Sequence, residues 1–139
     1  MKLNRLLILF FLMLPMVAYG QLRTSDLVDP EPISIPQNVS QSQAMEAVVN
    51  ALFSRDWAVA EEGDDYIIAE LHVRAHWAEI GIDFTEDDIK ISYRNSDNLR
   101  YTERDDGRVV IHNNYLAWID NLVNDIRTQL SRAQRDARR

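Results

Sequence analysis

Apolar residues recur with two different spacings along this chain, and the change between them restricts the fold more than any other feature of the sequence. Between residues 66 and 93 apolar and polar residues alternate, whereas the flanking segments repeat their apolar residues with the period of a helix. Polar residues on the second face of each strand favour an antiparallel sheet that is covered on one side only. The residues expected to face inward are Ile67, Ala69, Leu71, Val73, Ala78, Ile80, Ile82, Phe84, Ile89, Ile91 and Tyr93.

Turn signals divide the alternating region into four strands. The strands are predicted at residues 57–61, 66–73, 77–84 and 89–93, with turns at 63–65, 74–75 and 85–88. The hairpin around the last turn places Asp83 opposite Lys90 and Glu79 opposite Arg94, and such opposite charges stabilise neighbouring strands. We expect this register because a shift of one residue would expose the whole apolar face.

One helix is predicted before the first strand and another after the last. The first is expected from Ser40 to about Ser54, where Ser40 and Gln43 form a capping box. The second carries one long apolar stripe. Its members are Tyr115, Trp118, Ile119, Leu122, Val123, Ile126, Leu130 and Ala133. This order predicts a two-layer α+β fold, with a four-stranded antiparallel meander and the N-terminal and C-terminal helices packed on one face.

The first 20 residues have the three parts of a secretory signal peptide. Two basic residues precede an apolar stretch, and Ala18 and Gly20 supply the small residues of a cleavage site. We expect cleavage after Gly20, export to the periplasm or beyond by a Gram-negative bacterium, and no transmembrane segment after cleavage. The predicted organisation is a signal peptide at 1–20, an extended proline-containing arm at 21–38, a single α+β domain at 39–135 and a basic tail at 136–139.

The charge balance and the absence of cysteine exclude several functions. The chain holds 15 Lys and Arg against 22 Asp and Glu, which disfavours nucleic-acid binding because little would neutralise a run of phosphates. Cysteine is absent, so disulfides, thiolate metal ligands and cysteine nucleophiles are excluded. The Arg-rich tail permits only a weak contact with an anionic membrane surface, because the body of the chain is acidic.

Two histidines have the spacing of metal ligands but are predicted to point apart. His72 and His76 flank a two-residue turn at Arg74 and Ala75, and the parity of the two strands then places them on opposite faces of the sheet. His112 follows a long polar loop. We therefore predict that the three histidines share no metal, and we expect no cofactor.

No catalytic residue is predicted. Glu70 and Glu79 are expected to face each other across two strands, where paired carboxylates could act as general acid and base. Arg94 gives Glu79 an ordinary cross-strand partner instead. The sequence contains neither G-x-S-x-G nor S-x-x-K and has too few glycines for a phosphate loop. We therefore expect that the chain is not an enzyme.

A polar loop at residues 95–108 holds the candidate binding site. A loop of this length needs fixed partners to stay ordered, and Leu99 and Tyr101 are its only sizeable apolar anchors. We expect the loop to fold back over the start of the final helix. The candidate binding residues are Asn98, Tyr101, His112, Asn114, Tyr115 and Trp118.

Polar residues at the margins of the helix stripe leave two alternatives open. Their side chains could hydrogen-bond the backbone of the long loop, as marginal polar groups usually do, or they could bind a ligand. The residues concerned are Asn114, Asn121 and Asp125.

Residues 92–130 resemble the sequences of one bacterial family. The chain reads Asn98-Leu99-x-Tyr101, then Ile111-His112-x-Asn114-Tyr115-x-x-Trp118-Ile119-x-Asn121-Leu122-x-x-Asp125-Ile126. This pattern is similar to that of a family of small exported proteobacterial proteins, many of them lipoproteins, with no assigned activity. The resemblance implies the exported compartment and the fold, and it transfers no catalytic residue. Lipoprotein members carry a cysteine where this chain has Gln21, so lipid anchoring is not implied.

Three functions are compatible with these features. The first is an exported, non-enzymatic module that binds a protein or a small ligand in the cell envelope, through the open sheet face or through the loop and the region of His112. The second is an assembly or structural factor that acts through an edge strand, either 57–61 or 89–93. The third, favoured by no motif, is a hydrolase with an unsignalled site.

Overall fold

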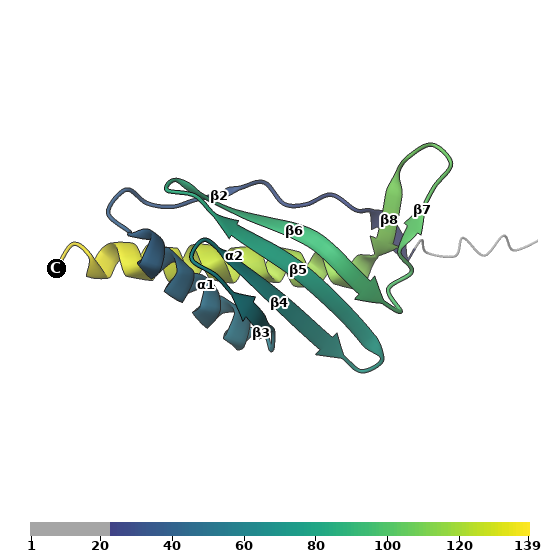
Figure 1. Cartoon of the computed structure of the whole chain (residues 1–139), viewed down its shortest axis with the longest axis horizontal. Coiled ribbons are helices and arrows are strands. Elements are labelled where there is room, and N and C mark those ends of the chain that lie inside the picture. The colour runs from purple at the N-terminus through teal and green to yellow at the C-terminus, as the bar shows by residue number, and fades with distance from the viewer. Residues whose placement is uncertain (1–22) are drawn as a thin grey trace, which may run out of the picture.

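The computed structural model describes residues 23–139, so the predicted signal peptide lies outside the described residues. Two helices and two antiparallel sheets, of five and three strands, make an α+β fold, as predicted (Figure 1). The predicted four-stranded meander forms only part of the larger sheet. The elements are β1 (Thr24–Asp26), β2 (Ile33–Ser34), α1 (Gln41–Ser54), β3 (Ala58–Glu62), β4 (Tyr66–Val73), β5 (His76–Phe84), β6 (Asp88–Asp97), β7 (Thr102–Glu103), β8 (Val109–His112) and α2 (Asn113–Asp136).

The larger sheet has the strand order β2-β6-β5-β4-β3. Asp83 of β5 lies opposite Lys90 of β6, which confirms that part of the predicted register. Glu79 pairs with Asn95 and not with Arg94, because a bulge makes Arg94 an extra residue in β6. The predicted ion pair still forms, with Arg94 Nε 3.1 Å from Glu79 Oε1. The side chain reaches across the bulge.

A two-residue turn joins β4 to β5, as predicted. Val73 pairs with His76, and Arg74 has a φ of +57°, since tight hairpins that follow the twist of the strands require a residue in the left-handed region. His72 is exposed on the open face of the sheet, whereas His76 is half-buried on the face toward α2. The two rings therefore point apart.

The two helices share one hydrophobic core with the inner face of the larger sheet. The predicted capping box begins α1: Ser40 Oγ accepts a hydrogen bond from Gln43 N–H, and Ser40 N–H donates to Gln43 Oε1. α2 runs behind the sheet along its length (Figure 1). In the described part of the chain, no helix is both long and apolar enough to cross a membrane. The largest fully buried side chains include Trp57, Tyr115, Leu52, Ile67, Ile80, Ile82, Ile89, Leu99, Ile111, Leu122 and Ile126.

The arm predicted at residues 21–38 contributes a short strand to each sheet, which the sequence analysis did not predict. β1 pairs with β8, and β2 pairs with β6 so that Ile33 lies opposite Ile89. Ile33 and Ile35 are buried, and the Ile35 N–H donates to the Asp87 carbonyl oxygen. Strands this short leave too few alternating residues for a pattern to identify them.

The segment predicted as a loop at residues 95–108 is also partly strand. β6 continues to Asp97, and β7 and β8 form a hairpin at one end of the molecule (Figure 1). Its turn is closed by the Arg104 N–H, which donates to the Arg108 carbonyl oxygen, and Gly107 there has a φ of +82°. The strand order of this second sheet is β1-β8-β7. It holds the N-terminal arm against the start of α2.

Candidate functional site

The buried side chain of Leu99 joins the end of β6 to the start of α2. We name the group of residues around it the seam. Its members are His76, Tyr93, Asn98, Leu99, Tyr101, His112, Tyr115 and Trp118. Leu99 is 1% exposed, and its carbonyl oxygen accepts a hydrogen bond from His112 N–H at 2.8 Å. Asn98 and Arg100 both have a φ of +56°. Two left-handed residues in three positions turn the chain sharply enough to insert the single apolar side chain between them. The predicted docking of the loop is confirmed for Leu99.

Two histidines and a tryptophan lie together in the seam. The ring centroids of His76 and His112 are 6.2 Å apart, and those of His76 and Trp118 are 6.5 Å apart. His76 Nδ1 lies 2.7 Å from the Asn98 carbonyl oxygen, so this nitrogen carries the proton that the carbonyl oxygen accepts. The Asn98 amide donates in turn to the Ala75 carbonyl oxygen at 3.3 Å. These bonds tie the β4–β5 turn to the end of β6.

His112 caps the N-terminus of α2. Its Nδ1 accepts a hydrogen bond from the Asn114 N–H at 3.1 Å, which requires an unprotonated Nδ1. Burial lowers the pKa of His112 below its ordinary value, and the charges of Arg100, His76 and Arg23 act in the same direction. The imidazole is therefore held neutral at the positive end of a helix dipole.

Three tyrosines complete the seam. Tyr93 stacks on Tyr101 with ring centroids 5.1 Å apart and an interplanar angle of 10°, and it meets Tyr115 edge to face at 5.6 Å. Tyr115 is 2% exposed, and its burial raises the pKa of its hydroxyl. Tyr101 is 40% exposed, with its hydroxyl donating to Glu103 Oε1 at 3.3 Å. Tyr101 contacts Tyr93, and Tyr93 in turn contacts Tyr115 of α2, so the predicted contact of Tyr101 with the helix is indirect.

The six candidate residues divide into three groups. The rings of His112 and Trp118 both lie near His76, and the rings of Tyr101 and Tyr115 both contact Tyr93. Asn98 bonds backbone, and Asn114 is exposed. His76 and Tyr93 are absent from the predicted site although they connect its members. The inward parity of both residues was the available signal, because it placed them on the sheet face that the helices were predicted to cover.

Asp125 does not hydrogen-bond the loop, which corrects one of the two expectations for the stripe margin. Its Oδ2 accepts from Arg55 Nε at 2.6 Å and its Oδ1 accepts from Arg55 Nη2 at 3.1 Å, and Ser54 Oγ lies 3.3 Å from Oδ2. The hydrogen bond from Arg55 is the main reason that the pKa of Asp125 is lowered. This fork ties α2 to the end of α1. Asn121 is exposed beside it on α2.

Metal-ligating side chains do not converge anywhere in residues 23–139. No group of three or more His, Asp or Glu residues in this part of the chain is placed to hold a metal ion. His76 and His112 lie close, but each uses its Nδ1 in a hydrogen bond within the seam. The seam is thus a packed connection whose polar atoms serve the loop and the helix cap.

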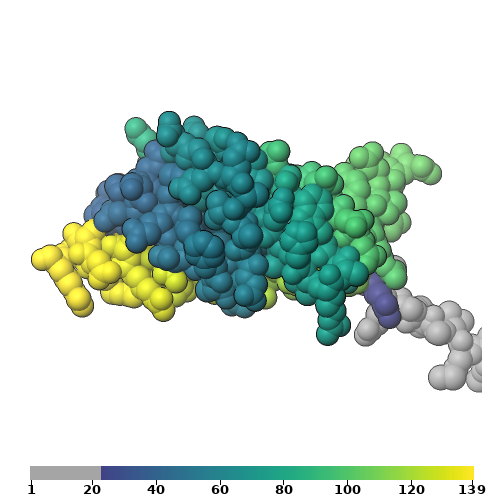
Figure 2. Space-filling view, turned by 60° about the horizontal axis from the view of Figure 1, so that its bottom comes forward, coloured from purple at the N-terminus to yellow at the C-terminus, as the bar shows by residue number. Residues whose placement is uncertain are grey.

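A second surface lies beside the free edge of β3, which is the last strand of the larger sheet. Met45, Val49 and Phe53 recur every four residues along α1, and Phe53 is 62% exposed. Figure 2 shows the surface of α1 beside that of the strands that follow it in the chain. We name the hollow between the first half of α1 and the end of β3 with the turn that follows it the edge groove.

The edge groove is an open depression of about 660 Å³. Its floor is fixed by a hydrogen bond from the Gln41 amide to the Asp64 carbonyl oxygen at 3.3 Å, which holds the start of α1 to the β3–β4 turn. All residues of β3 are exposed except Val59, which is half-buried. The lining residues are Gln41, Ser42, Met45, Glu46, Val49, Glu62, Gly63 and Asp64.

The opposite edge of the sheet is covered by the N-terminal arm. β2 pairs with the start of β6, and Asp29 Oδ1 accepts a hydrogen bond from the Tyr93 N–H at 2.9 Å. The prediction of an available edge at residues 89–93 is therefore wrong, because a segment without a strand pattern occupies it. The edge predicted at residues 57–61 is confirmed as the terminal strand.

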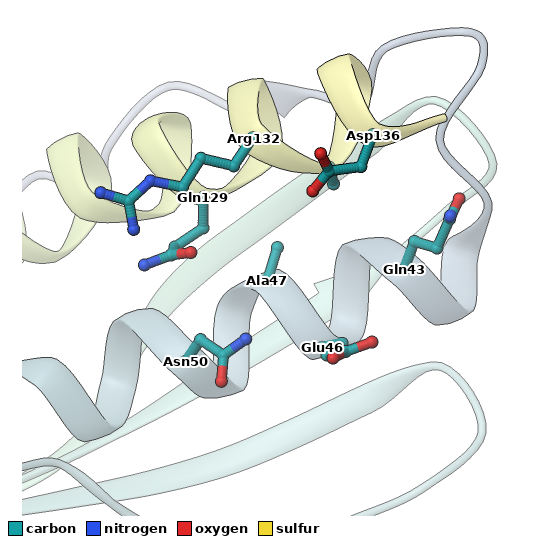
Figure 3. Close-up of a pocket in the computed structure, with 8 residues that line it drawn as sticks. Gln43, Glu46, Ala47, Asn50, Gln129, Arg132 and Asp136 are labelled. Carbon is teal, nitrogen blue, oxygen red and sulfur yellow. The ribbon is translucent and has the colours of Figure 1, made fainter. Parts of the chain in front are cut away.

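A smaller pocket of about 290 Å³ separates the two helices near the C-terminal end of α2. In Figure 3, Gln129, Arg132 and Asp136 of α2 lie across this pocket from Ala47 and other α1 residues. Ala47 has a small side chain, which leaves room for the pocket. Its walls are polar and of mixed charge, and they do not single out one class of ligand.

Comparison of the chain with protein-family models, with curated proteins and with solved structures gave no significant match. The resemblance of residues 92–130 to exported proteobacterial proteins stays a prediction.

Proposed function

We propose that this chain is an exported, non-enzymatic module of the cell envelope that binds another protein through the edge groove. The observation that carries the proposal is the free edge of β3 beside the apolar stripe of α1, of which Phe53 is exposed and Met45 and Val49 are half-buried. Exposed strand edges recognise extended segments by backbone hydrogen bonds, and an adjacent apolar surface supplies side-chain contacts. The location in the envelope rests on the features of residues 1–20.

The β3 edge is shaped for selective binding. Val59 pairs with Ala69 and Glu61 pairs with Ile68, so Ala60 is an extra, unpaired residue in a bulge. Bulges and charged residues on an edge strand hinder indiscriminate sheet-to-sheet association. In the described part of the chain, the outward backbone groups of β3 have no strand beside them. They remain available for a segment that tolerates the bulge.

The seam supports a structural role better than a binding role. The Asn98 amide and the Nδ1 atoms of His76 and His112 hydrogen-bond backbone atoms of the chain itself. Buried or marginal polar groups that are already satisfied gain little from a ligand. A small-ligand site centred on Tyr101 and His112 is therefore not the function that we propose.

Photo-crosslinking in the intact cell envelope tests the proposal. The full chain, with its own leader, carries p-benzoyl-phenylalanine in place of Phe53, the exposed apolar residue four positions after Val49 of the edge groove. Val28 is the matched control position, because it is an equally apolar residue that is 72% exposed elsewhere on the surface. We expect a discrete adduct from position 53 and none from position 28.

Dependence on the strand edge separates binding from random capture. Ala60→Pro removes an N–H at an unpaired position and places a ring on the edge. Ala60→Ser keeps the N–H and is the control. The adduct from position 53 should disappear with Ala60→Pro and persist with Ala60→Ser. An adduct that persists in both variants, or no adduct from position 53, would contradict the proposal.

A further inference from the structure

We propose that the second half of α2 docks this chain reversibly on an anionic lipid surface. The contact is made by five exposed arginines, which we name the basic face: Arg127, Arg132, Arg135, Arg138 and Arg139. The inference goes beyond the proposed function, because the lining of the edge groove contains no residue of α2. It follows from the position of these arginines, from their lack of ion-pair partners and from the side chains around them.

The basic face lies on the side of α2 that is turned away from the core. Arg127, Ser131 and Arg135 follow one another at intervals of four residues, which places them in one exposed row along the helix. Ile126 and Leu130 belong to the buried side of the same turns. Figure 2 shows the last turns of α2, in yellow, protruding at one end of the molecule. The arginines are therefore presented together to the surroundings.

The arginines of the basic face are not used inside the fold. The ion pairs formed by arginine within residues 23–139 involve Arg55, Arg94 and Arg108. A favourable interaction with the helix dipole accounts for a cation in the last turn, which holds Arg135. It does not account for Arg127, which lies two turns earlier. The basic face thus holds more positive charge than the fold requires.

The neighbouring side chains leave the arginines as the main feature of this surface. The hydroxyls of Thr128 and Ser131 donate to the carbonyl oxygens of Asn124 and Arg127, at 3.0 and 2.9 Å. In the second half of α2, no large apolar side chain is exposed. A contact made by this face therefore stays at the level of polar headgroups and does not insert into the hydrocarbon of a bilayer.

Lipid phosphates match this chemistry. A guanidinium group donates two parallel hydrogen bonds to a phosphate and stays charged at every physiological pH. Each cation held near an anionic bilayer tightens binding by about fivefold. Because the attraction is electrostatic, it is reversible and is screened by salt.

The distribution of acidic residues favours a flat anionic surface over a flexible polyanion. The chain has a formal net charge of −7, but residues 127–139 contain five Arg and a single acidic residue, Asp136. Glu46 of α1 lies near the margin of the basic face, since it lines the same pocket as Arg132. A bilayer touches one side of the molecule only, whereas a nucleic acid that bends around the chain also meets its carboxylates.

Co-sedimentation with lipid vesicles tests the inference. The chain from Gln21 onward is used, because the apolar stretch of the leader would itself enter lipid. One set of vesicles contains phosphatidylcholine alone, and the other contains phosphatidylcholine and phosphatidylglycerol in equal parts. We expect sedimentation with the phosphatidylglycerol vesicles only, and release of the chain at high salt. A single-stranded oligonucleotide, added as a competitor, should not displace the chain from these vesicles.

Variants assign the binding to the basic face. Arg127→Gln combined with Arg135→Gln should weaken binding to the phosphatidylglycerol vesicles by roughly thirtyfold, because two cations are lost. Arg127→Lys combined with Arg135→Lys keeps both charges and should retain most of the binding. Lys90→Gln combined with Arg104→Gln is the matched control, since it removes the same charge from exposed positions on other elements. Asp136→Asn should strengthen binding. Circular dichroism of each variant checks the fold.

Several results would overturn the inference. They are equal sedimentation with both kinds of vesicle, no sedimentation with either, displacement by the oligonucleotide, and an equal loss of binding in the Lys90/Arg104 control. None of these results bears on the edge groove. The crosslink from position 53 should persist when Arg127 and Arg135 are both replaced by Gln, so the two proposals fail separately.

Discussion

His112 Nδ1 accepts the hydrogen bond of the Asn114 N–H, so that an imidazole performs the capping function usually supplied by Ser, Thr, Asp or Asn. A protonated ring cannot accept this bond, and its charge would face the positive end of α2. The seam therefore contains a helix cap that depends on pH.

Folding stability should fall when His112 becomes protonated. Because burial lowers the pKa of His112 in the folded chain, the unfolded chain binds the proton first as the pH drops through about 6.5. The stabilisation by the His112 cap is lost between that pH and the lower pKa that His112 has in the folded chain. Above this pH window the stabilisation is fully present. Thermal melts between about pH 8 and pH 5 measure the loss.

His112→Asn should remove that loss, since Asn caps helices without titrating. His72→Asn is the control, because it removes an exposed imidazole from the open face of the sheet. The capping account is wrong if His112→Asn and the wild type lose the same melting temperature on acidification.

Leu99 should contribute more to stability than Tyr101. Leu99→Ala empties a buried position and is expected to cost about 2–5 kcal/mol. Tyr101→Ala removes a ring that is 40% exposed and stacked on Tyr93, and it is expected to cost about 0.5–1.5 kcal/mol. Urea denaturation gives both values. Equal costs would show that Tyr101 anchors the loop as firmly as Leu99.

The pair of Arg55 and Asp125 should stabilise the chain only where Asp125 is ionised. The hydrogen bond from Arg55 lowers the pKa of Asp125, so the contribution is present above about pH 4 and is lost as the pH falls through the lower pKa of the folded chain. Asp125→Asn should lower the melting temperature slightly near pH 7 and less near pH 3. A double-mutant cycle with Arg55→Gln tests the coupling, and additive effects would show that the pair is not coupled.

Asp56 follows the end of α1 with a φ of +62°. Glycine is the preferred residue at this position because it adopts left-handed backbone without a steric cost. Asp56→Gly should therefore raise the free energy of unfolding by about 1 kcal/mol. Asp56→Ala removes the same charge but keeps the steric cost, so it should not reproduce the gain. Equal stabilisation by both variants would assign the effect to charge.

The long amphipathic and alternating segments could be predicted because each offers many residues to one periodicity. The register of Asp83 with Lys90 and the turn at Arg74 followed from that alternation. The bulge at Arg94 did not, since an extra residue interrupts the pattern at one point. β2 also escaped prediction, because Ile33 and Ile35 are too few to define a strand.

The candidate site, too, could be predicted from the sequence only in part. Leu99 could be predicted as an anchor because it is one of two large apolar residues in a polar loop. The separation of Tyr101 from Tyr115 by Tyr93 depends on side-chain packing between distant segments, which no spacing encodes. Which sheet edge stays free depends on which edge the arm covers, and the pairing of β2 with β6 and the bond between Asp29 and Tyr93 reveal that only in the folded chain.

Amide hydrogen exchange of the mature chain, with and without the partner protein captured by the crosslink at position 53, tests the central claim most directly. The account predicts slower exchange at the amides of Ala58–Glu62, where a strand is added, and no change at the seam from Leu99 to His112. Ala60→Pro should remove the protection. Protection at the seam, with unchanged exchange along β3, would contradict the account and return the binding site to the loop and the start of α2.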